Sequence, residues 1–109
     1  MARVVAVIPD LMFGSRVVAT LGAAGHEVEL VSSPGTADLG AADMVIVDLG
    51  EIAPGLIADS GAPVLGFYSH VDVETRERAE SAGVDLIVPR SRMAREMPAL
   101  VESLLTRSG

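Results

Sequence analysis

Four polar residues each follow a short apolar run of the kind that forms a buried β-strand. Two carboxylates on neighbouring strands can hold a hard cation such as Mg²⁺. A hydroxyl can bind a phosphoryl oxygen, and a fixed cation can pair with either group. If the chain brings them to one edge of a sheet, they predict a polar crevice with most of the groups that phosphoryl transfer needs. The four residues are Asp10, Asp48, Ser69 and Arg90.

The elements that must position these residues are strands alternating with helical segments. Parallel strands joined through helices require right-handed crossovers, and the sheet is then covered on both faces. The pattern predicts an α/β fold: a doubly wound (βα)5 three-layer sandwich, flavodoxin-like, with a five-stranded parallel sheet of order 2-1-3-4-5. The ends of the first and third strands then flank the usual ligand crevice. The predicted strands are 4–8, 26–32, 44–47, 62–68 and 84–88, and the predicted helices are 14–25, 37–42, 51–60, 71–82 and 91–106.

Composition narrows the class of protein. The 109 residues form a single domain, 1–109, and half of them are hydrophobic while only 3% are aromatic, so the core is aliphatic. The absence of cysteine excludes disulfides and thiolate chemistry. A net charge of -7 argues against direct nucleic-acid binding. No apolar run is long enough to span a membrane, and the first residues lack a signal-peptide pattern, so we expect a cytoplasmic protein.

In order, spacing and loop position, these residues resemble the receiver domain of two-component response regulators over essentially the whole chain. In that family two acids after the first strand bind Mg²⁺, and the third strand ends in the phosphoacceptor aspartate. The fourth strand ends in Ser or Thr and the fifth in lysine. The resemblance implies that Asp10 is the second acid, Asp48 the phosphoacceptor and Ser69 the hydroxyl, with Arg90 in the place of the lysine.

The sequence departs from that family at four positions. Pro9 stands where the first acid belongs, so at most a weak Mg²⁺ site at Asp10 and Asp48 is expected, with no other cofactor. Arg90 replaces the lysine, and its planar fork is no substitute for a compact ammonium group. Ile87 takes the place of the aromatic residue that moves on activation in many receivers. Ser91 replaces the usual proline.

Three functions compete. The first is a stand-alone receiver-like (pseudo-receiver) signalling domain that is not an enzyme and acts through contacts with a protein partner, with phosphorylation at Asp48 weak or lost. The second is a small-molecule or anion sensor, in which Arg90, Arg92 and Ser69 bind a phosphate-bearing ligand. The third is a structural or oligomerising module, because a mean hydropathy of +0.45 suggests a homodimer.

Each site residue also has a purely structural interpretation. Asp10, Asp48 and Ser69 could cap the segments that follow them. Arg90 could pair with either aspartate and so fill the crevice. Phe13 is expected in the core, one turn before Val17. Leu11 and Met12 are expected in a loop over the crevice, where an apolar lip suits the docking of a partner.

Overall fold

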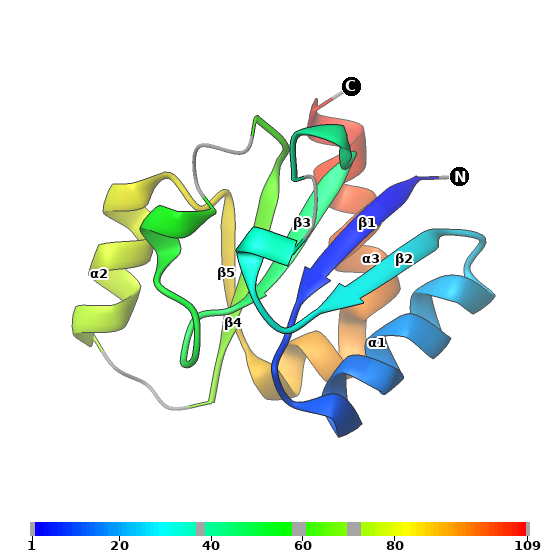
Figure 1. Cartoon of the computed structure of the whole chain (residues 1–109), viewed down its shortest axis with the longest axis horizontal. Coiled ribbons are helices and arrows are strands. Elements are labelled where there is room, and N and C mark those ends of the chain that lie inside the picture. The colour runs from blue at the N-terminus through cyan, green and yellow to red at the C-terminus, as the bar shows by residue number, and fades with distance from the viewer. Residues whose placement is uncertain (1, 37–38, 58–60, 70–72, 109) are drawn as a thin grey trace.

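A computed structural model describes residues 2–36, 39–57, 61–69 and 73–108. Its centre is a parallel five-stranded sheet in the order β2-β1-β3-β4-β5 (Figure 1). The predicted fold class and strand order are confirmed. No helix of the described residues is long and apolar enough to cross a membrane. The strands are β1 (Arg3–Val7), β2 (Glu27–Val31), β3 (Met44–Asp48), β4 (Val64–Tyr68) and β5 (Leu86–Pro89).

The two central strands owe their place to continuous apolar sequence. β3 is buried at every residue, and β1 at every residue after Arg3. Strands of a parallel sheet that are covered on both faces need such runs, because neither face meets water. β1 and β3 pair in register from Val4 with Met44 to Val7 with Val47. β2 alternates polar and apolar residues and lies at the edge of the sheet, as predicted.

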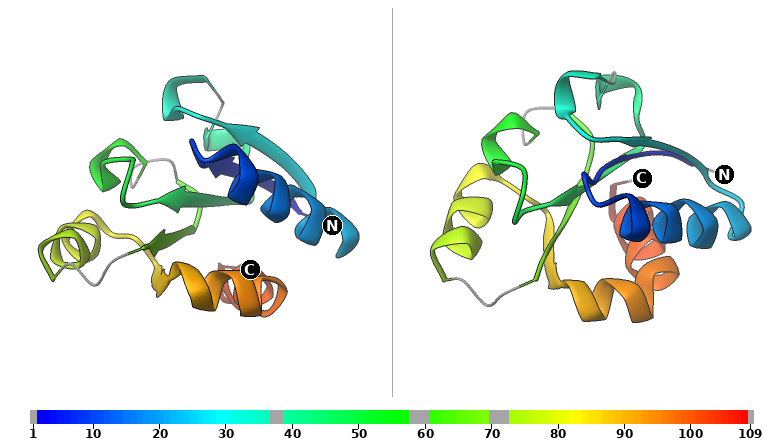
Figure 2. Two further views of the ribbon diagram at one scale, coloured as in Figure 1. Left: turned by 90° about the horizontal axis from the view of Figure 1, so that it is seen from below. Right: turned by 60° about the horizontal axis from the view of Figure 1, so that its bottom comes forward.

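One face of the sheet is covered by α1 (Leu11–Ala23) and α3 (Arg90–Ser108), as Figures 1 and 2 show. The amphipathic stripe predicted for the last helix is confirmed, with Leu105 only partly buried. α3 has non-helical backbone angles at Glu96, just before Pro98, because proline cannot donate a hydrogen bond inside a helix. The buried stripe comprises Met93, Met97, Leu100, Val101 and Leu104.

The opposite face has a thinner cover. It consists of α2 (Val73–Ala82) and three short 3-10 turns: η1 (Pro34–Thr36), η2 (Leu39–Ala41) and η3 (Pro54–Leu56). The helices predicted at 37–42 and 51–60 are therefore wrong in the described residues; positions 37–38, 58–60 and 71–72 of the predicted helices lie outside them. Pro54 sits between Ala53 and Gly55, and both proline and glycine are poor helix formers.

In the predicted helix 51–60, the spacing of Ile52, Leu56 and Ile57 predicts that all three face inward; two of these positions are correct and one is wrong. Ile52 and Ile57 are buried against this face of the sheet, whereas Leu56 is 64% exposed. A 3-10 turn has a different periodicity from an α-helix, so the spacing assumed for a helix misplaced Leu56.

α1 begins earlier than the sequence suggested. It starts at Leu11 instead of near Gly14, because the side chain of Asp10 caps its first turn. It ends as predicted: Gly25 has φ +94°, in the left-handed region that closes helices and favours glycine. Leu11 and Met12 thus lie in the first helical turn, 72% and 87% exposed, and not in a loop over the crevice. Phe13 is buried, as predicted.

Candidate functional site

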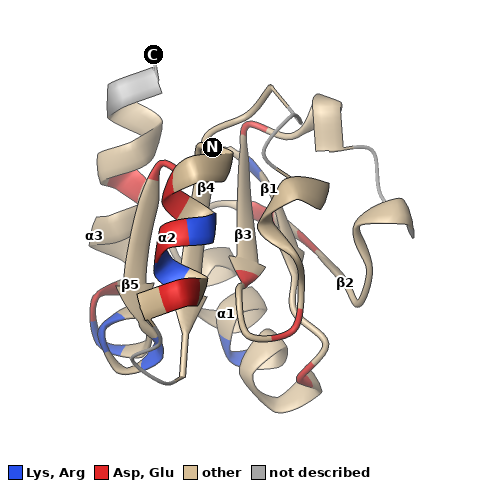
Figure 3. Ribbon diagram, turned by 90° about the vertical axis from the view of Figure 1, so that its left-hand side faces the viewer, with Lys and Arg blue, Asp and Glu red and all other residues tan. Residues whose placement is uncertain are grey.

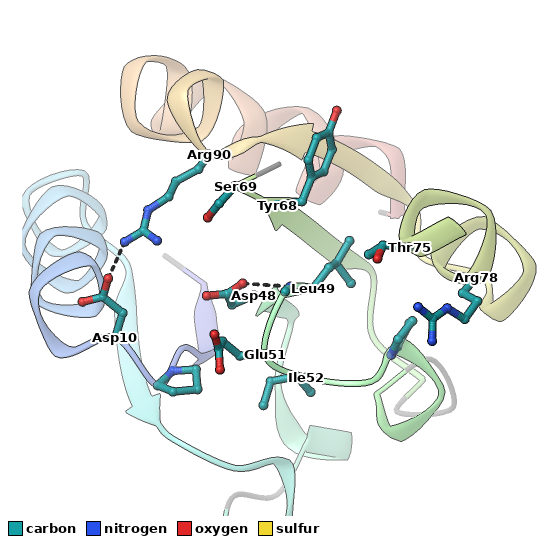
Figure 4. A pocket seen from close by; sticks show the side chains of 13 residues that line it. Asp10, Asp48, Leu49, Glu51, Ile52, Tyr68, Ser69, Thr75, Arg78 and Arg90 are labelled. Carbon is teal, nitrogen blue, oxygen red and sulfur yellow. Dashed lines mark hydrogen bonds and ion pairs between the residues drawn. The ribbon is translucent and has the colours of Figure 1, made fainter. Parts of the chain in front are cut away.

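The carboxyl ends of β1, β3 and β4 and the first residue of α3 surround a cavity of about 790 Å³ (Figure 4). All four polar residues singled out from the sequence line it: Asp10, Asp48, Ser69 and Arg90. They meet because parallel strands place their carboxyl ends at the same edge of the sheet, and the strand order changes direction between β1 and β3.

Asp10 holds the start of α1 with one carboxylate oxygen and Arg90 with the other. Its Oδ1 accepts from the backbone N–H groups of Met12, at 3.0 Å, and Phe13, at 3.3 Å. Its Oδ2 accepts from Nη2 of Arg90 at 2.5 Å. The hydrogen bond from Arg90, followed by the one from the Phe13 backbone, lowers the pKa of Asp10. Both structural roles considered for Asp10, helix cap and ion-pair partner, are therefore present together.

Arg90 is held by an aromatic ring as well as by Asp10. Its guanidinium carbon lies 4.3 Å from the centroid of the Phe13 ring, within the range of a cation–π interaction. The Phe13 ring in turn contacts that of Phe67 in β4, with centroids 5.0 Å apart. Arg90 therefore joins the start of α3 to the start of α1 over an aromatic pair, and its side chain extends toward Asp10 (Figure 4).

Asp48 lies at the centre of the cavity and is almost fully buried. It is the last residue of β3, and only 4% of it is exposed. Its Oδ1 accepts from the N–H of Gly50 at 3.0 Å, which closes the turn after the strand. Burial raises the pKa of Asp48, and the hydrogen bond from Gly50 opposes that rise only in part. The site favours the protonated carboxyl more than water does.

Three further polar residues of this cavity, Glu51, Thr75 and Arg78, were not predicted from the sequence. Glu51 follows Asp48 by three positions, and its carboxylate lies beside that of Asp48 (Figure 4). Thr75 and Arg78 reach the cavity from α2. Their spacing of three residues places them on one helix face, a signal that was available in the sequence. The charged residues of the predicted helix 71–82, Arg78 among them, read as its solvent-exposed face, and this obscured the signal.

Three other predicted site residues, Arg92, Leu11 and Met12, lie elsewhere. Arg92 does not line the cavity, and its Nε lies 3.5 Å from Oε1 of Glu96 on the same helix. An anion site built from Arg90 and Arg92 together therefore lacks its second arginine. Leu11 and Met12 are not among the lining residues either.

The residues present fit Mg²⁺ poorly. Both oxygens of Asp10 already accept hydrogen bonds, and Pro9 offers no side-chain oxygen. The raised pKa of Asp48 disfavours the anionic form that a hard cation requires. Among the described residues no three His, Asp or Glu side chains are grouped so that they could hold a metal ion.

Comparison with known proteins identifies the fold. No protein-family model and no curated protein matches the chain. Among solved structures, a receiver domain protein from Methanospirillum hungatei JF-1 superimposes with a TM-score of 0.85 at 16% identity, covering 98% of this chain and 95% of that one. The receiver domain of the Francisella response regulator 1452 superimposes with a TM-score of 0.84 at 13% identity, and both chains are fully covered. The non-phosphorylated HemR receiver domain of Leptospira biflexa gives 0.79 at 19% identity, covering 96% and 94%.

These likenesses show that the chain has the receiver fold, a five-stranded parallel sheet of order 2-1-3-4-5 with flanking helices. The three structural neighbours named above are receiver domains.

Proposed function

We propose that this chain is a receiver-like signalling domain that works through contacts with other proteins and in which phosphoryl transfer to Asp48 is weak or lost. The observation that carries the proposal is the position of Arg90. Its guanidinium is held by Asp10 and by the Phe13 ring, and it forms no ion pair with the carboxylate of Asp48, on which it acts only through its charge. A cation fixed in this way is not poised to neutralise charge that develops on a phosphoryl group at Asp48.

The state of Asp48 supports the same conclusion. A phosphoacceptor carboxylate attacks phosphorus with a lone pair, so the anionic form is the reactive one. Burial favours the protonated form at Asp48. Pro9 stands where the receiver family has its first acid, so the chain lacks one carboxylate that could bind a metal ion. A bound metal ion could have favoured the anionic form of Asp48. The domain would then signal through its surface, with no phosphorylation cycle.

The direct test is to incubate the purified protein with Mg²⁺ and acetyl phosphate or phosphoramidate and to measure its intact mass. We expect little or no mass gain of one phosphoryl group. Substantial phosphorylation that disappears in the Asp48→Asn variant would contradict the proposal and make the domain a working receiver.

A gain-of-function variant makes the test sharper. The double variant Pro9→Asp/Arg90→Lys restores the two side chains that the receiver resemblance leads one to expect. If those two replacements explain the lost chemistry, the double variant should accept a phosphoryl group at Asp48 under conditions in which the natural chain does not. The matched control is Arg92→Lys, which changes an arginine of the same helix that does not line the cavity.

A further inference from the structure

The cavity contains two charges that no described residue neutralises. Glu51 and Arg78 both line it, and neither side chain makes an ion pair or a hydrogen bond with another described residue. Figure 4 shows the Glu51 carboxylate beside Asp48, and Arg78 on the opposite side, where it extends from α2. Acidic and basic residues alternate along that helix (Figure 3). The cavity therefore has an acidic end and a basic end.

Apolar side chains separate these two ends. Leu49 and Ile52 are buried and line the cavity between them (Figure 4). Pro54 lines it as well. A molecule that spans the cavity would therefore meet a negative group, then an apolar stretch, then a positive group.

The remaining charges of the cavity cancel each other. Asp10 and Arg90 are joined by a hydrogen-bonded ion pair, so neither is free to take a ligand without breaking that contact. A simple anion would be attracted by Arg78 but repelled by Glu51 and by any ionised Asp48. A simple cation would leave Arg78 without a partner. Opposite charges at two ends require a ligand that carries both.

We propose that the cavity binds a small zwitterion, with an ammonium group at Asp48 and Glu51 and a carboxylate or phosphate at Arg78 and Thr75. A short apolar linker between them would lie against Leu49 and Ile52. The volume of about 790 Å³ is within the range of small-molecule sites. The ligand would act as the input of the domain in place of phosphorylation; in this respect alone the inference rests on the proposed function.

Binding of an ammonium group beside Asp48 has a measurable consequence. A neighbouring positive charge favours the ionised carboxyl, so the ligand opposes the effect that burial has on the pKa of Asp48. At a pH where Asp48 is partly protonated in the free protein, binding should therefore release a proton to the buffer. A titration repeated at several acidic pH values should then find a pH at which the heat of binding depends on the ionisation enthalpy of the buffer, and this dependence should vanish in the Asp48→Asn variant.

The experiment is isothermal titration calorimetry of the full chain with ω-amino acids from glycine to 6-aminohexanoate and with phosphoethanolamine. Pentanoate and pentylamine serve as single-charge controls. We expect saturable binding by at least one zwitterion and binding about tenfold weaker or worse for either control, the ratio that corresponds to about 1.4 kcal/mol. Absence of binding by every zwitterion, or equal binding by a single-charge control, would overturn the proposal.

Variants locate the two ends. Glu51→Gln and Arg78→Gln should each weaken binding about tenfold, because each removes one charge-assisted contact. Both residues are exposed, so neither variant should unfold the chain. The matched control is Arg76→Gln on the same helix, where Arg76 pairs with Glu80 and does not line the cavity. Binding that is unchanged in both cavity variants would overturn the assignment. Titration reports ligand binding and intact mass reports phosphorylation, so the two proposals fail separately.

Discussion

Asp10 and Asp48 follow neighbouring strands of one sheet and line one cavity, yet their carboxylates are in opposite environments. Asp10 is partly exposed, caps α1 and pairs with Arg90, and its pKa is lowered. Asp48 is buried with a single backbone hydrogen bond from Gly50, and its pKa is raised. The same side chain is stabilised as an anion at the end of β1 and disfavoured as an anion at the end of β3.

The difference follows from where the guanidinium of Arg90 is held. Arg90 lies over the Phe13 ring, which belongs to the helix that Asp10 caps, so it pairs with Asp10; within the described part of the chain, Asp48 has no ion-pair partner. A two-acid site thus becomes one neutralised ion pair beside one buried carboxyl. Variants at four places test this comparison. They change the Phe13 ring, the buried Asp48, the capping Asp10 and, as a reference, the exposed pair Leu11 and Met12.

The largest effect is expected from Phe13→Ala. It removes a buried ring that packs on Phe67 and supports Arg90, and large-to-small core changes of this kind cost about 3–5 kcal/mol. Urea denaturation measures the loss. Phe13→Leu keeps an apolar side chain and should cost less than about 1.5 kcal/mol. Equal losses in the two variants would contradict this expectation and show that the aromatic ring itself, and not apolar volume, stabilises this end of the sheet.

Asp48→Asn should stabilise the protein at neutral pH, by on the order of 1 kcal/mol, because it removes a buried charge while its amide oxygen can still accept from Gly50. The pKa of Asp48 is higher in the folded chain than the ordinary value of 3.8, so the natural protein loses stability as pH rises from 3.8 through the folded value. The gain from the variant should therefore disappear below pH 3.8.

Thermal or urea unfolding at several pH values measures this difference. Glu51→Gln is the matched control, because Glu51 is an exposed acid beside Asp48. The free energy of unfolding of this variant should stay within about 0.5 kcal/mol of that of the natural protein. An Asp48→Asn variant that is less stable than the natural protein at pH 7 would mean that Asp48 is not disfavoured as an anion.

Asp10→Asn should act in the opposite direction and more weakly. Asparagine is also a good helix cap, so the variant removes mainly the charge that attracts Arg90. The pKa of Asp10 is lower in the folded chain than 3.8, so its contribution is present above pH 3.8 and is lost as pH falls through the folded value. The melting temperature of the variant should be lower at pH 7 and approach that of the natural protein in acid.

The smallest effect is expected from the double variant Leu11→Ser/Met12→Ser. Both residues are largely exposed in the first turn of α1, so the free energy of unfolding should change by less than about 0.5 kcal/mol. If this apolar patch serves as a docking surface, the variant should nevertheless self-associate less, as measured by size-exclusion chromatography with light scattering at high concentration. A loss of stability above 1 kcal/mol would show that these side chains belong to the core.

The sequence predicted the sheet better than the helices. Continuous apolar runs at β1 and β3 and the alternating pattern at β2 each have one simple physical meaning, burial on both faces or on one. The segment 51–60 was predicted as a helix because Ile52, Leu56 and Ile57 have helical spacing. Pro54 and Gly55 interrupt the backbone there, and local backbone chemistry outweighed the pattern.

What the sequence determined by itself is the strand order and the convergence of Asp10, Asp48, Ser69 and Arg90, because the topology of a parallel sheet places strand ends together whatever side chains follow. The partner of Arg90 was decided only by the tertiary structure. From the sequence, Asp10 and Asp48 were equal candidates for the ion pair with Arg90. The position of the Phe13 ring and the burial of β3 decided between them. Distances and solvent exposure set the charge state of a carboxyl, and neither is determined by residue order alone.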